Sequence, residues 1–550
     1  MTLRIPALLG AFLLSAPVFA QTDTQTTAPV GQLEAAPVKQ EQASLSPVSK
    51  AIKDALATLP RQTAAQKKRA TEITRWYEGR NYGPHWVRDG KPTPAAERVT
   101  FTLFKASEEG LDPADYGAAK LFGKLDVAGP EKLGQFEVAL SDSAVQYGQH
   151  LHSGRVDPSK INRELMLYPD TLSADKMLDK LSEGGRSTTT LAEMSPQTDR
   201  YARLKKHLLT LRLRAADGGY TAIPEGEVIK PEGSDPRIPL IRKRLIESGD
   251  LPENLHTGEV LDGKLLQALK YYQYRMGLEA DGVIGPATLA QMNIPIADRI
   301  TQVEINLERR RWMQADFGER YIFVNLADQV LKVVDKEKTV HATIVQVGLP
   351  FHRTPVFTDQ MEYVDFNPFW NVPYSIATKE YLPKLKRNPY ALQSQKIRVL
   401  RGGSVVNPGS VPWSRYSRGN FPVRLRQDPG PKNALGRVKF MFPNKHNIYI
   451  HDTPSKSKFS RASRYFSHGC VRVQNPFELA KVVLGFQGVT EDQINGWANS
   501  GKKKIVRLEQ KLPVHIAYLT AWVNKDGSVH YRRDIYGRDK ILKKALAKAS

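Results

Sequence analysis

Residues 467–475 read Ser-His-Gly-Cys-Val-Arg-Val-Gln-Asn and contain the single cysteine of the 550-residue chain, Cys470. Nineteen positions upstream, His451 ends a short apolar run. A lone cysteine in an exported protein has no internal disulfide partner, so it is either an inert packing residue or a reactive group. Nearby histidines favour reactivity, because an imidazole can accept the thiol proton. We therefore predict that Cys470 is a nucleophile.

The residues before this histidine predict a strand with two different faces. Alternation along 447–451 directs Ile448 and Ile450 to one side and Tyr449 with His451 to the other. If the isoleucines are buried, the tyrosine and the histidine face a common cleft.

The residues after the thiol predict a helix. Asn475 can cap it, Pro476 suits its first position and Gly485 is a plausible end. Cys470 should then lie in the turn leading to a helix N-terminus, a place that lowers the pKa of a thiol.

A zinc site is the rival interpretation, because His451, Asp452, His468 and Cys470 are all potential ligands. No helical H-E-x-x-H motif is present, and a thiolate would close a four-ligand site without leaving a place for water. We therefore predict no metal and no other cofactor.

The region after residue 299 has the pattern of a mostly β domain. Segments rich in β-branched and aromatic residues predict consecutive antiparallel strands at 321–325, 330–334 and 342–348, with further strands at 362–365, 437–442 and 447–451. Between about 375 and 427 this regularity is lost, and eleven Lys or Arg residues occur. We expect a capping insert near the site there, with a solvated surface excursion as the alternative.

The rest of the chain predicts helical domains behind an export signal. A basic start, an apolar stretch and small residues at 16–20 predict a signal peptide at 1–20, cleaved after about Ala20. Residues 21–50 have the composition of a disordered tether. Helical periodicity then predicts a scaffold domain at 51–236 and a small module at 237–298, followed by the β domain at 299–550.

Composition limits the partners. No later segment approaches the roughly 20 apolar residues of a transmembrane helix. The formal net charge of +23 either attracts the protein to an anionic polymer, a lipid surface or an acidic peptide, or serves solubility alone. Export and the lack of a reading motif argue against nucleic acid.

Two stretches resemble known families. The segment 451–454 followed by 467–472 resembles the signature of the L,D-transpeptidases, whose catalytic domain is of the YkuD type, and residues 267–292 resemble the peptidoglycan-binding domain. Further matches to the transpeptidases lie at 348–350, 354–357, 367–373, 429–436 and 513–539. The order of the segments resembles that of the large Gram-negative L,D-transpeptidases, which implies a periplasmic protein.

The resemblance implies an α+β multidomain fold: a helical scaffold, a three-helix peptidoglycan-binding module and a mostly β catalytic domain with its insert. It implies Cys470 as the nucleophile and His451 as the general base, with the backbone carbonyl of Asp452 holding the imidazole tautomer. The residues alone leave open whether His468, two positions from the thiol, shapes the loop or is the base. The residues implied to shape the loop, the oxyanion site and the substrate pocket are Tyr449, Ser467, His468, Gly469, Arg472 and Trp370.

The implied reaction is acyl transfer on peptidoglycan stem peptides. Cys470 attacks the diaminopimelate carbonyl of a donor tetrapeptide, D-alanine leaves, and an acceptor amine takes the acyl group to form a 3-3 cross-link. Water as the acceptor would make the protein an L,D-carboxypeptidase, and a non-catalytic wall-binding protein is the other alternative. The implied partners are peptidoglycan stems and glycan, with periplasmic wall-synthesis proteins beside them; carbapenems should acylate the thiol.

Overall fold

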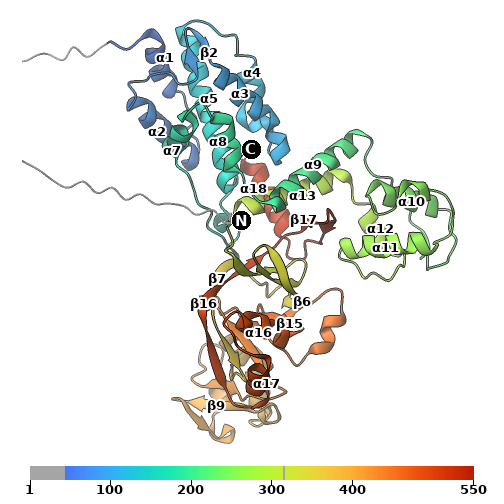
Figure 1. The fold of residues 1–550 in the computed structure, drawn as a ribbon. Helices are drawn as coiled ribbons and strands as arrows, with labels where there is room; N and C mark the ends of the chain where they lie inside the picture. The colour runs from blue at the N-terminus through green and yellow to red at the C-terminus, as the bar shows by residue number, and fades with distance from the viewer. Residues whose placement is uncertain (1–43, 314–315, 550) are drawn as a thin grey trace, which may run out of the picture. The chain divides into compact units, whose positions relative to one another are not determined.

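The computed structural model describes residues 44–313 and 316–549 (Figure 1). The predicted signal peptide and most of the predicted tether lie outside these residues. Helix α1 (Pro47–Leu56) begins inside the segment predicted as a tether, because Ser46 accepts a hydrogen bond from the Ser49 N–H and Pro47 takes the first helical position.

The N-terminal region is helical, as predicted. Besides α1 it contains α2 (Ala64–Glu78), α3 (Pro94–Phe104), α4 (Ala118–Phe122), α5 (Pro130–Ser153), α6 (Pro158–Ile161), α7 (Ala174–Ser182) and α8 (Ser187–Met194), with short strands β1 (Val87–Arg88), β2 (Lys91–Pro92) and β3 (Leu165–Met166). A capping box between Thr63 and Gln66 starts α2. The apolar faces of most of these helices form one core, to which α5 contributes most.

A second core contains the predicted three-helix module, α10 (Ile238–Glu247), α11 (Gly263–Arg275) and α12 (Pro286–Met292). It also includes residues of α9 (Asp199–Ala216), α13 (Ile296–Arg311) and the hairpin β17 (Ala521–Val523) and β18 (Val529–Tyr531). Helix α9 lies in the predicted scaffold domain, yet its leucines pack into this second core. Helix α13 crosses the predicted boundary at 298/299. The three-helix module therefore shares its core with elements on both sides of it in the sequence.

The C-terminal region is a 10-stranded mixed sheet in the order β12-β13-β15-β6-β5-β4-β16-β7-β3, with β14 paired to β6. Its strands are β4 (Arg320–Asn325), β5 (Val330–Asp335), β6 (Lys338–Gly348), β7 (Val356–Phe366), β12 (Val438–Met441), β13 (Ile450–His451), β14 (Tyr465–Ser467), β15 (Val471–Val473) and β16 (Lys504–Ala517), and β3 from the helical region. The predicted antiparallel order of β4, β5 and β6 is confirmed. Since β12 also pairs with β7, the sheet closes on itself.

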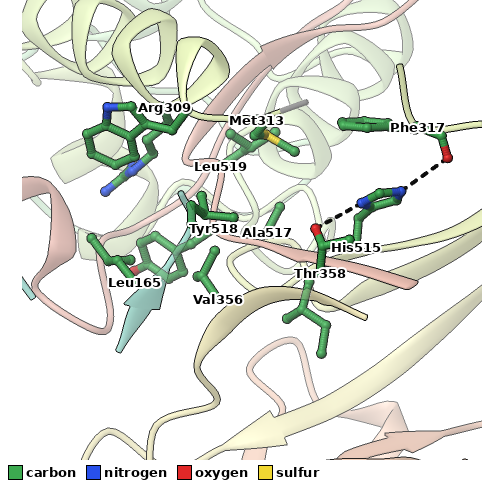
Figure 2. A pocket seen from close by; sticks show the side chains of 13 residues that line it. Leu165, Arg309, Met313, Phe317, Val356, Thr358, His515, Ala517, Tyr518 and Leu519 are labelled. Atoms are coloured by element: carbon green, nitrogen blue, oxygen red, sulfur yellow. Dashed lines mark hydrogen bonds between the residues drawn. The ribbon is translucent and has the colours of Figure 1, made fainter. Parts of the chain in front are cut away.

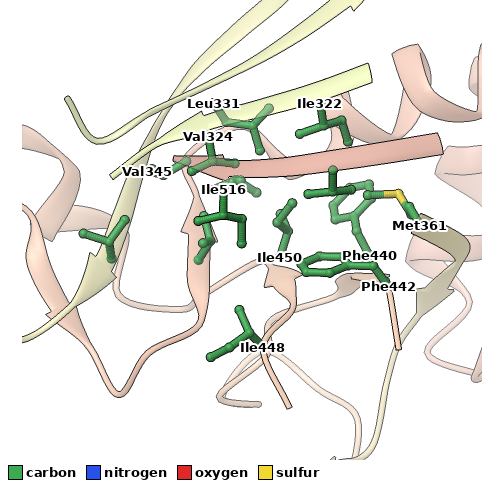
Figure 3. Close-up of a cluster of buried hydrophobic side chains, with 14 of the residues drawn as sticks. Ile322, Val324, Leu331, Val345, Met361, Phe440, Phe442, Ile448, Ile450 and Ile516 are labelled. Carbon is green, nitrogen blue, oxygen red and sulfur yellow. The ribbon is translucent and has the colours of Figure 1, made fainter. Parts of the chain in front are cut away.

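The closed sheet surrounds an apolar core (Figure 3). Ile448 and Ile450 belong to this core, so the predicted alternation is confirmed at these positions. Regular strand geometry is confined to the last two residues of the predicted strand, because Asn447 has a φ of +54°. Helices α16 (Pro476–Gly485), α17 (Glu491–Asn499) and α18 (Arg538–Ala549) complete this region.

The segment predicted as irregular is a folded subdomain. It contains α14 (Tyr374–Ile376) and α15 (Leu382–Arg387), and a four-stranded sheet in the order β10-β9-β11-β8. The strands are β8 (Trp370–Asn371), β9 (Ile397–Arg401), β10 (Ser404–Val406) and β11 (Arg424–Gln427). A hydrophobic cluster of its own includes Trp413 and Phe421, which contradicts a solvated surface excursion.

Among the described residues, no helix is both long enough and apolar enough to span a bilayer.

Candidate active site

Two adjacent parallel strands bring the predicted catalytic residues onto one face of the sheet. In the β13–β15 pair, Ile450 lies opposite Val471 and His451 opposite Arg472. Because Ile450 and Val471 point into the core, the residues beside them point the other way. His451 and Arg472 therefore share a face, with Tyr449 and Cys470 directly before their strands, and the rings of Tyr449 and His451 are 5.5 Å apart.

The His451 imidazole is held in one tautomer. Its Nδ1 donates a hydrogen bond to the backbone carbonyl of Asp452 at 2.5 Å, which leaves Nε2 without a proton. The side chain is only 3% exposed. Burial, with help from the charge of Arg472, lowers the pKa of His451 to about 3. The ring is therefore neutral near pH 7, with the lone pair of Nε2 free.

The carboxylate of Asp452 anchors the segment that follows the histidine. Its Oδ1 accepts hydrogen bonds from the Thr453 N–H and the Lys456 ammonium, both at 2.7 Å. Its Oδ2 accepts one from the Arg437 N–H at 2.9 Å. Gly436 passes so close that an added Cβ would lie 2.2 Å from this oxygen. The sequence indicated a role for the Asp452 carbonyl only.

Residue Cys470 is partly exposed, and its Sγ lies 3.6 Å from the carbonyl oxygen of Asn447. Burial of the sulfur raises the pKa of Cys470, against the opposing effects of a backbone hydrogen bond from Tyr449 and the charges of Lys439 and Arg472. The predicted lowering of this pKa by a helix N-terminus is wrong.

The physical reason is the distance along the chain. Strand β15 separates Cys470 from α16, and the Asn475 side chain makes no capping hydrogen bond within the described chain. The helix itself begins at Pro476, as predicted. Cys470 therefore lies too far from the first turn of α16 for the helix dipole to lower the pKa of its thiol.

The loop before the thiol is braced from within. The Ser467 hydroxyl, 1% exposed, donates to the Cys470 carbonyl at 2.6 Å and accepts from the Gly469 N–H at 3.0 Å. The Thr354 hydroxyl donates to the Gly469 carbonyl at 2.7 Å and accepts from the Gly348 N–H. Ser467 is thus a loop brace rather than a substrate contact, and the Gly469 N–H is already engaged. The sequence assigned no role to Thr354.

His468 points toward the insert. Its Nε2 lies 3.0 Å from the Glu380 carboxylate in the turn Ala377–Tyr381, and its ring is 4.9 Å from that of His352. This placement fits a loop-shaping residue and leaves the proton-accepting position to His451.

Trp370 lies inside the hydrophobic cluster of the insert, 8% exposed, with its ring 6.3 Å from that of Tyr381. Trp370 thus contributes to the packing of the insert, and its substrate contact stays a prediction. Tyr449 packs against the same cluster. The insert therefore touches the active-site face at Tyr449 and at His468.

A lysine that the sequence analysis missed completes the face. Lys439 on β12 lies opposite His451, and its ammonium is 3.9 Å from the centre of the Tyr449 ring. Burial lowers the pKa of Lys439. Its position between buried Val438 and Phe440 is the signal that could have found it, since alternation places it outside the core.

One cavity of the structure lies away from the active-site face, and another lies next to it. A small one of about 20 Å³ lies between α13, β3, β7 and β16, where His515 bonds to Thr358 and to the Phe317 carbonyl (Figure 2). It has room for about one water and contains no active-site residue. An open cleft of about 740 Å³ lies beyond the ends of β13 and β15, lined by Asp452 and Gln474 among others. Within the described residues, no cluster of His, Cys, Asp and Glu side chains could hold a metal.

Three family models match separate parts of the chain. Residues 71–208 match a "Scaffold domain", residues 234–292 a "Putative peptidoglycan binding domain" and residues 319–516 an "L,D-transpeptidase catalytic domain". These matches agree with the observed order of a helical region, a three-helix module and a mostly β region.

A protein of Haemophilus influenzae named "Putative L,D-transpeptidase" is 35% identical over 222 residues, which is 40% of this chain and 45% of that protein. The chain thus spans less than half the length of this curated relative. Two solved structures are also similar, an L,D-transpeptidase from Xylanimonas cellulosilytica and an Ldtfm-avibactam carbamoyl enzyme. They are 14% and 11% identical over 53% and 57% of this chain, each covered to 98%, with TM-scores of 0.16 and 0.18, too low to carry an argument.

Proposed function

We propose that the protein is a cysteine L,D-transpeptidase of peptidoglycan, because residues 319–516 match an L,D-transpeptidase catalytic domain and residues 234–292 match a peptidoglycan-binding domain. The observation that carries the proposal is the face shared by His451 and Arg472, with Tyr449 and Cys470 directly before their strands. On this face the thiol of Cys470 precedes the strand residue next to His451, and the accepting nitrogen of the neutral His451 imidazole is fixed.

In the first half-reaction, His451 Nε2 takes the thiol proton as Cys470 Sγ attacks the diaminopimelate carbonyl carbon of a donor tetrapeptide. The carbonyl π electrons move to oxygen. On collapse, the C–N bond to D-alanine breaks, and His451 returns the proton to the leaving amine. A thioester on Cys470 and free D-alanine result.

In the second half-reaction, an acceptor amine attacks the thioester carbonyl and gives a proton to His451. The C–S bond breaks, the thiolate leaves, and His451 reprotonates the sulfur. The new amide joins two diaminopimelate residues as a 3-3 cross-link. Water in place of the amine would release a tripeptide.

The charges around the thiol support this sequence. Because His451 stays neutral, it supplies no resting imidazolium to stabilise a thiolate. Lys439 and Arg472 supply positive charge in its place. Since burial raises the pKa of Cys470, proton transfer and attack occur together rather than from a preformed thiolate.

Two groups remain to stabilise the oxyanion once the Gly469 N–H is bonded to Ser467. These are the Cys470 N–H and the Tyr449 hydroxyl. Burial raises the pKa of Tyr449, so the phenol stays protonated and can donate. One such donor is worth about 10²–10³ in rate.

The test combines a covalent probe with product analysis. A carbapenem should add one equivalent of mass to the protein, and Cys470→Ala should abolish the adduct. With tetrapeptide-rich sacculi, muropeptide analysis should show 3-3 cross-linked dimers and released D-alanine. Tripeptides alone would replace the proposal with a carboxypeptidase, and an unchanged profile without adduct would leave a non-catalytic wall-binding protein.

We further infer that the protein works in the periplasm, with residues 1–20 as its signal peptide. The matched peptidoglycan-binding domain supports a wall location. N-terminal sequencing of the mature protein after periplasmic extraction tests this directly, with Gln21 as the expected first residue.

A further inference from the structure

The capping insert concentrates the positive charge of the chain. Residues 375–427 contain eleven Lys or Arg residues and one acidic residue, a net charge of +10, against +23 for all 550 residues. Most of these cations are exposed. A charge this concentrated on a folded subdomain indicates an anionic ligand more strongly than the same charge spread over the surface would.

Three arginines of the insert share one face of its sheet. Arg426 on β11 lies directly opposite Arg398 on β9, and Arg424 is two positions along β11. The other face of the same strands is buried, since Val399 and Leu425 belong to the cluster of the insert. We call Arg398, Arg424 and Arg426 the arginine face.

Only part of the arginine face is neutralised, because Arg398 alone of the three is ion-paired among the described residues. Arg398 bonds to Asp428 at 2.9 Å, while the Arg426 guanidinium lies 4.5 Å from the centre of the Phe369 ring. Its Nε is buried and lacks a hydrogen-bond partner among the described residues. Like charges directly opposite on antiparallel strands destabilise a sheet. Asp428 offsets part of this cost at Arg398, and an anion bound beside Arg426 and Arg424 would supply the counter-charge that these two arginines lack.

Apolar side chains lie within the same face. Leu400, opposite Arg424 on β9, and Val405, opposite Leu400 on β10, point to the arginine side. Val405 is 56% exposed. A ligand that combines carboxylates with aliphatic carbon chains fits this surface better than a bare inorganic ion does.

We propose that the arginine face binds stem-peptide carboxylates of peptidoglycan and so gives the protein a second contact with the wall, separate from the three-helix module. The planar fork of arginine matches a carboxylate through two parallel hydrogen bonds. The insert contacts the active-site face through Glu380 and Tyr449. A peptidoglycan stem bound to the arginine face would therefore be held close to the catalytic domain. This inference rests on the proposed function.

The experiment measures sedimentation of the full-length protein with purified sacculi at low salt. The triple variant R398Q/R424Q/R426Q should bind about tenfold more weakly than the parent. A matched triple variant on exposed lysines of α18, K540Q/K543Q/K544Q, removes the same charge and should bind within twofold of the parent. The variant R398K/R424K/R426K keeps the charge without the fork and should recover only part of the binding.

A second arm identifies the ligand group. Sacculi whose stem carboxylates have been amidated should bind the parent as weakly as unmodified sacculi bind the glutamine variant. Equal losses in both glutamine variants would reduce the effect to net charge and overturn the proposal. Unchanged binding to amidated sacculi would also overturn it, because the anion would then be another group.

The outcomes stay separate from those of the proposed function. Carbapenem adduct formation at Cys470 reports folding and reactivity in every variant, and it should match the parent. A parent without an adduct contradicts the transpeptidase proposal, whereas an adduct together with unchanged sacculus binding by the glutamine variant contradicts the arginine face alone.

Discussion

Gly436 illustrates how a single residue constrains the active site from outside it. Its φ of +62° lies in the left-handed region, and its Cα passes the carboxylate that fixes the segment after His451. Side chains are disfavoured at this position twice, by the backbone conformation and by the missing space. The position of Asp452, and with it the hydrogen bond that orients the His451 imidazole, therefore depends on residue 436 having no Cβ.

The first prediction concerns Gly436→Ala. The new Cβ would displace the Asp452 carboxylate, so we expect a loss of about 1–3 kcal/mol in the free energy of unfolding and slower acylation of Cys470. Denaturant titration and carbapenem acylation rates measure the two effects. Gly485→Ala is the control, because no atom lies within 4 Å of its added Cβ. Equal behaviour of both variants would contradict the assigned role of Gly436.

The second prediction concerns Lys439. A positive charge near the sulfur favours the thiolate, so Lys439→Met should raise the pKa of Cys470 and slow alkylation at pH 7 by about tenfold. Iodoacetamide labelling across pH measures this without ambiguity, since the chain has one cysteine. Lys439→Arg should retain the parent profile, and Lys445→Met, at an exposed position, should leave it unchanged. A slower rate with an unshifted pH profile would indicate packing instead.

At the scale of elements, sequence patterns predicted what depends on local periodicity. The strands β4 to β6, the helix beginning at Pro476 and the burial of Ile448 and Ile450 all follow from alternation or capping signals. Local periodicity does not predict which residues distant in the sequence become neighbours in the fold. The lowered thiol pKa was wrong because a short strand, β15, separates Cys470 from the helix.

The same limit applies to the site. Lys439 reaches His451 only through strand pairing between residues distant in the sequence, and the Ser467 hydroxyl turns inward because its partners lie within its own loop. Alternation could place Lys439 outside the core, but periodicity does not name its cross-strand partner or the direction of the Ser467 hydroxyl. The regular sheet of the insert was missed because its strands are short and separated by proline-rich and glycine-rich turns.

Strand β3 is the element that joins the helical region to the catalytic sheet. It pairs in parallel with β7, with Leu165 opposite Val356, and Leu165 is 3% exposed. The third prediction is that Leu165→Ala lowers the free energy of unfolding by about 2–4 kcal/mol. The acylation activity should then be lost at a lower temperature. Leu213→Ala, at a position 64% exposed, should change neither quantity, and an equal loss there would refute the assignment.

At the scale of the whole molecule, buried neutral histidines make stability depend on pH. Burial lowers the pKa values of six of them to about 3 or 4: His85, His150, His207, His451, His515 and His530. The unfolded chain binds protons at these side chains below about pH 6.5, whereas the native protein does not. Their contribution is therefore complete above that pH and decreases as the pH falls.

Buried carboxyls act in the opposite direction, since burial raises the pKa values of Asp115, Glu304, Asp365 and Asp539, and most clearly that of Glu137. Burial raises the pKa of Glu137 to about 7, so the native state binds a proton there that the unfolded chain has released. The fourth prediction is a net uptake of protons on unfolding near pH 5, set mainly by the six histidines, and a Tm that falls from pH 7 to pH 5. Calorimetry in buffers of different ionisation enthalpy counts these protons. A constant Tm over this interval would contradict the prediction.

The closure of the sheet by β7 and β12 has a consequence for how this architecture can change. Phe366 and Val438 are cross-strand partners, although the whole insert lies between them in the chain. The two ends of the insert therefore leave the sheet from adjacent antiparallel strands, β7 and β12. The insert can be exchanged as one unit. Evolution or a designer could replace it by a tight turn, or by a subdomain with another specificity, without moving the register of the catalytic strands.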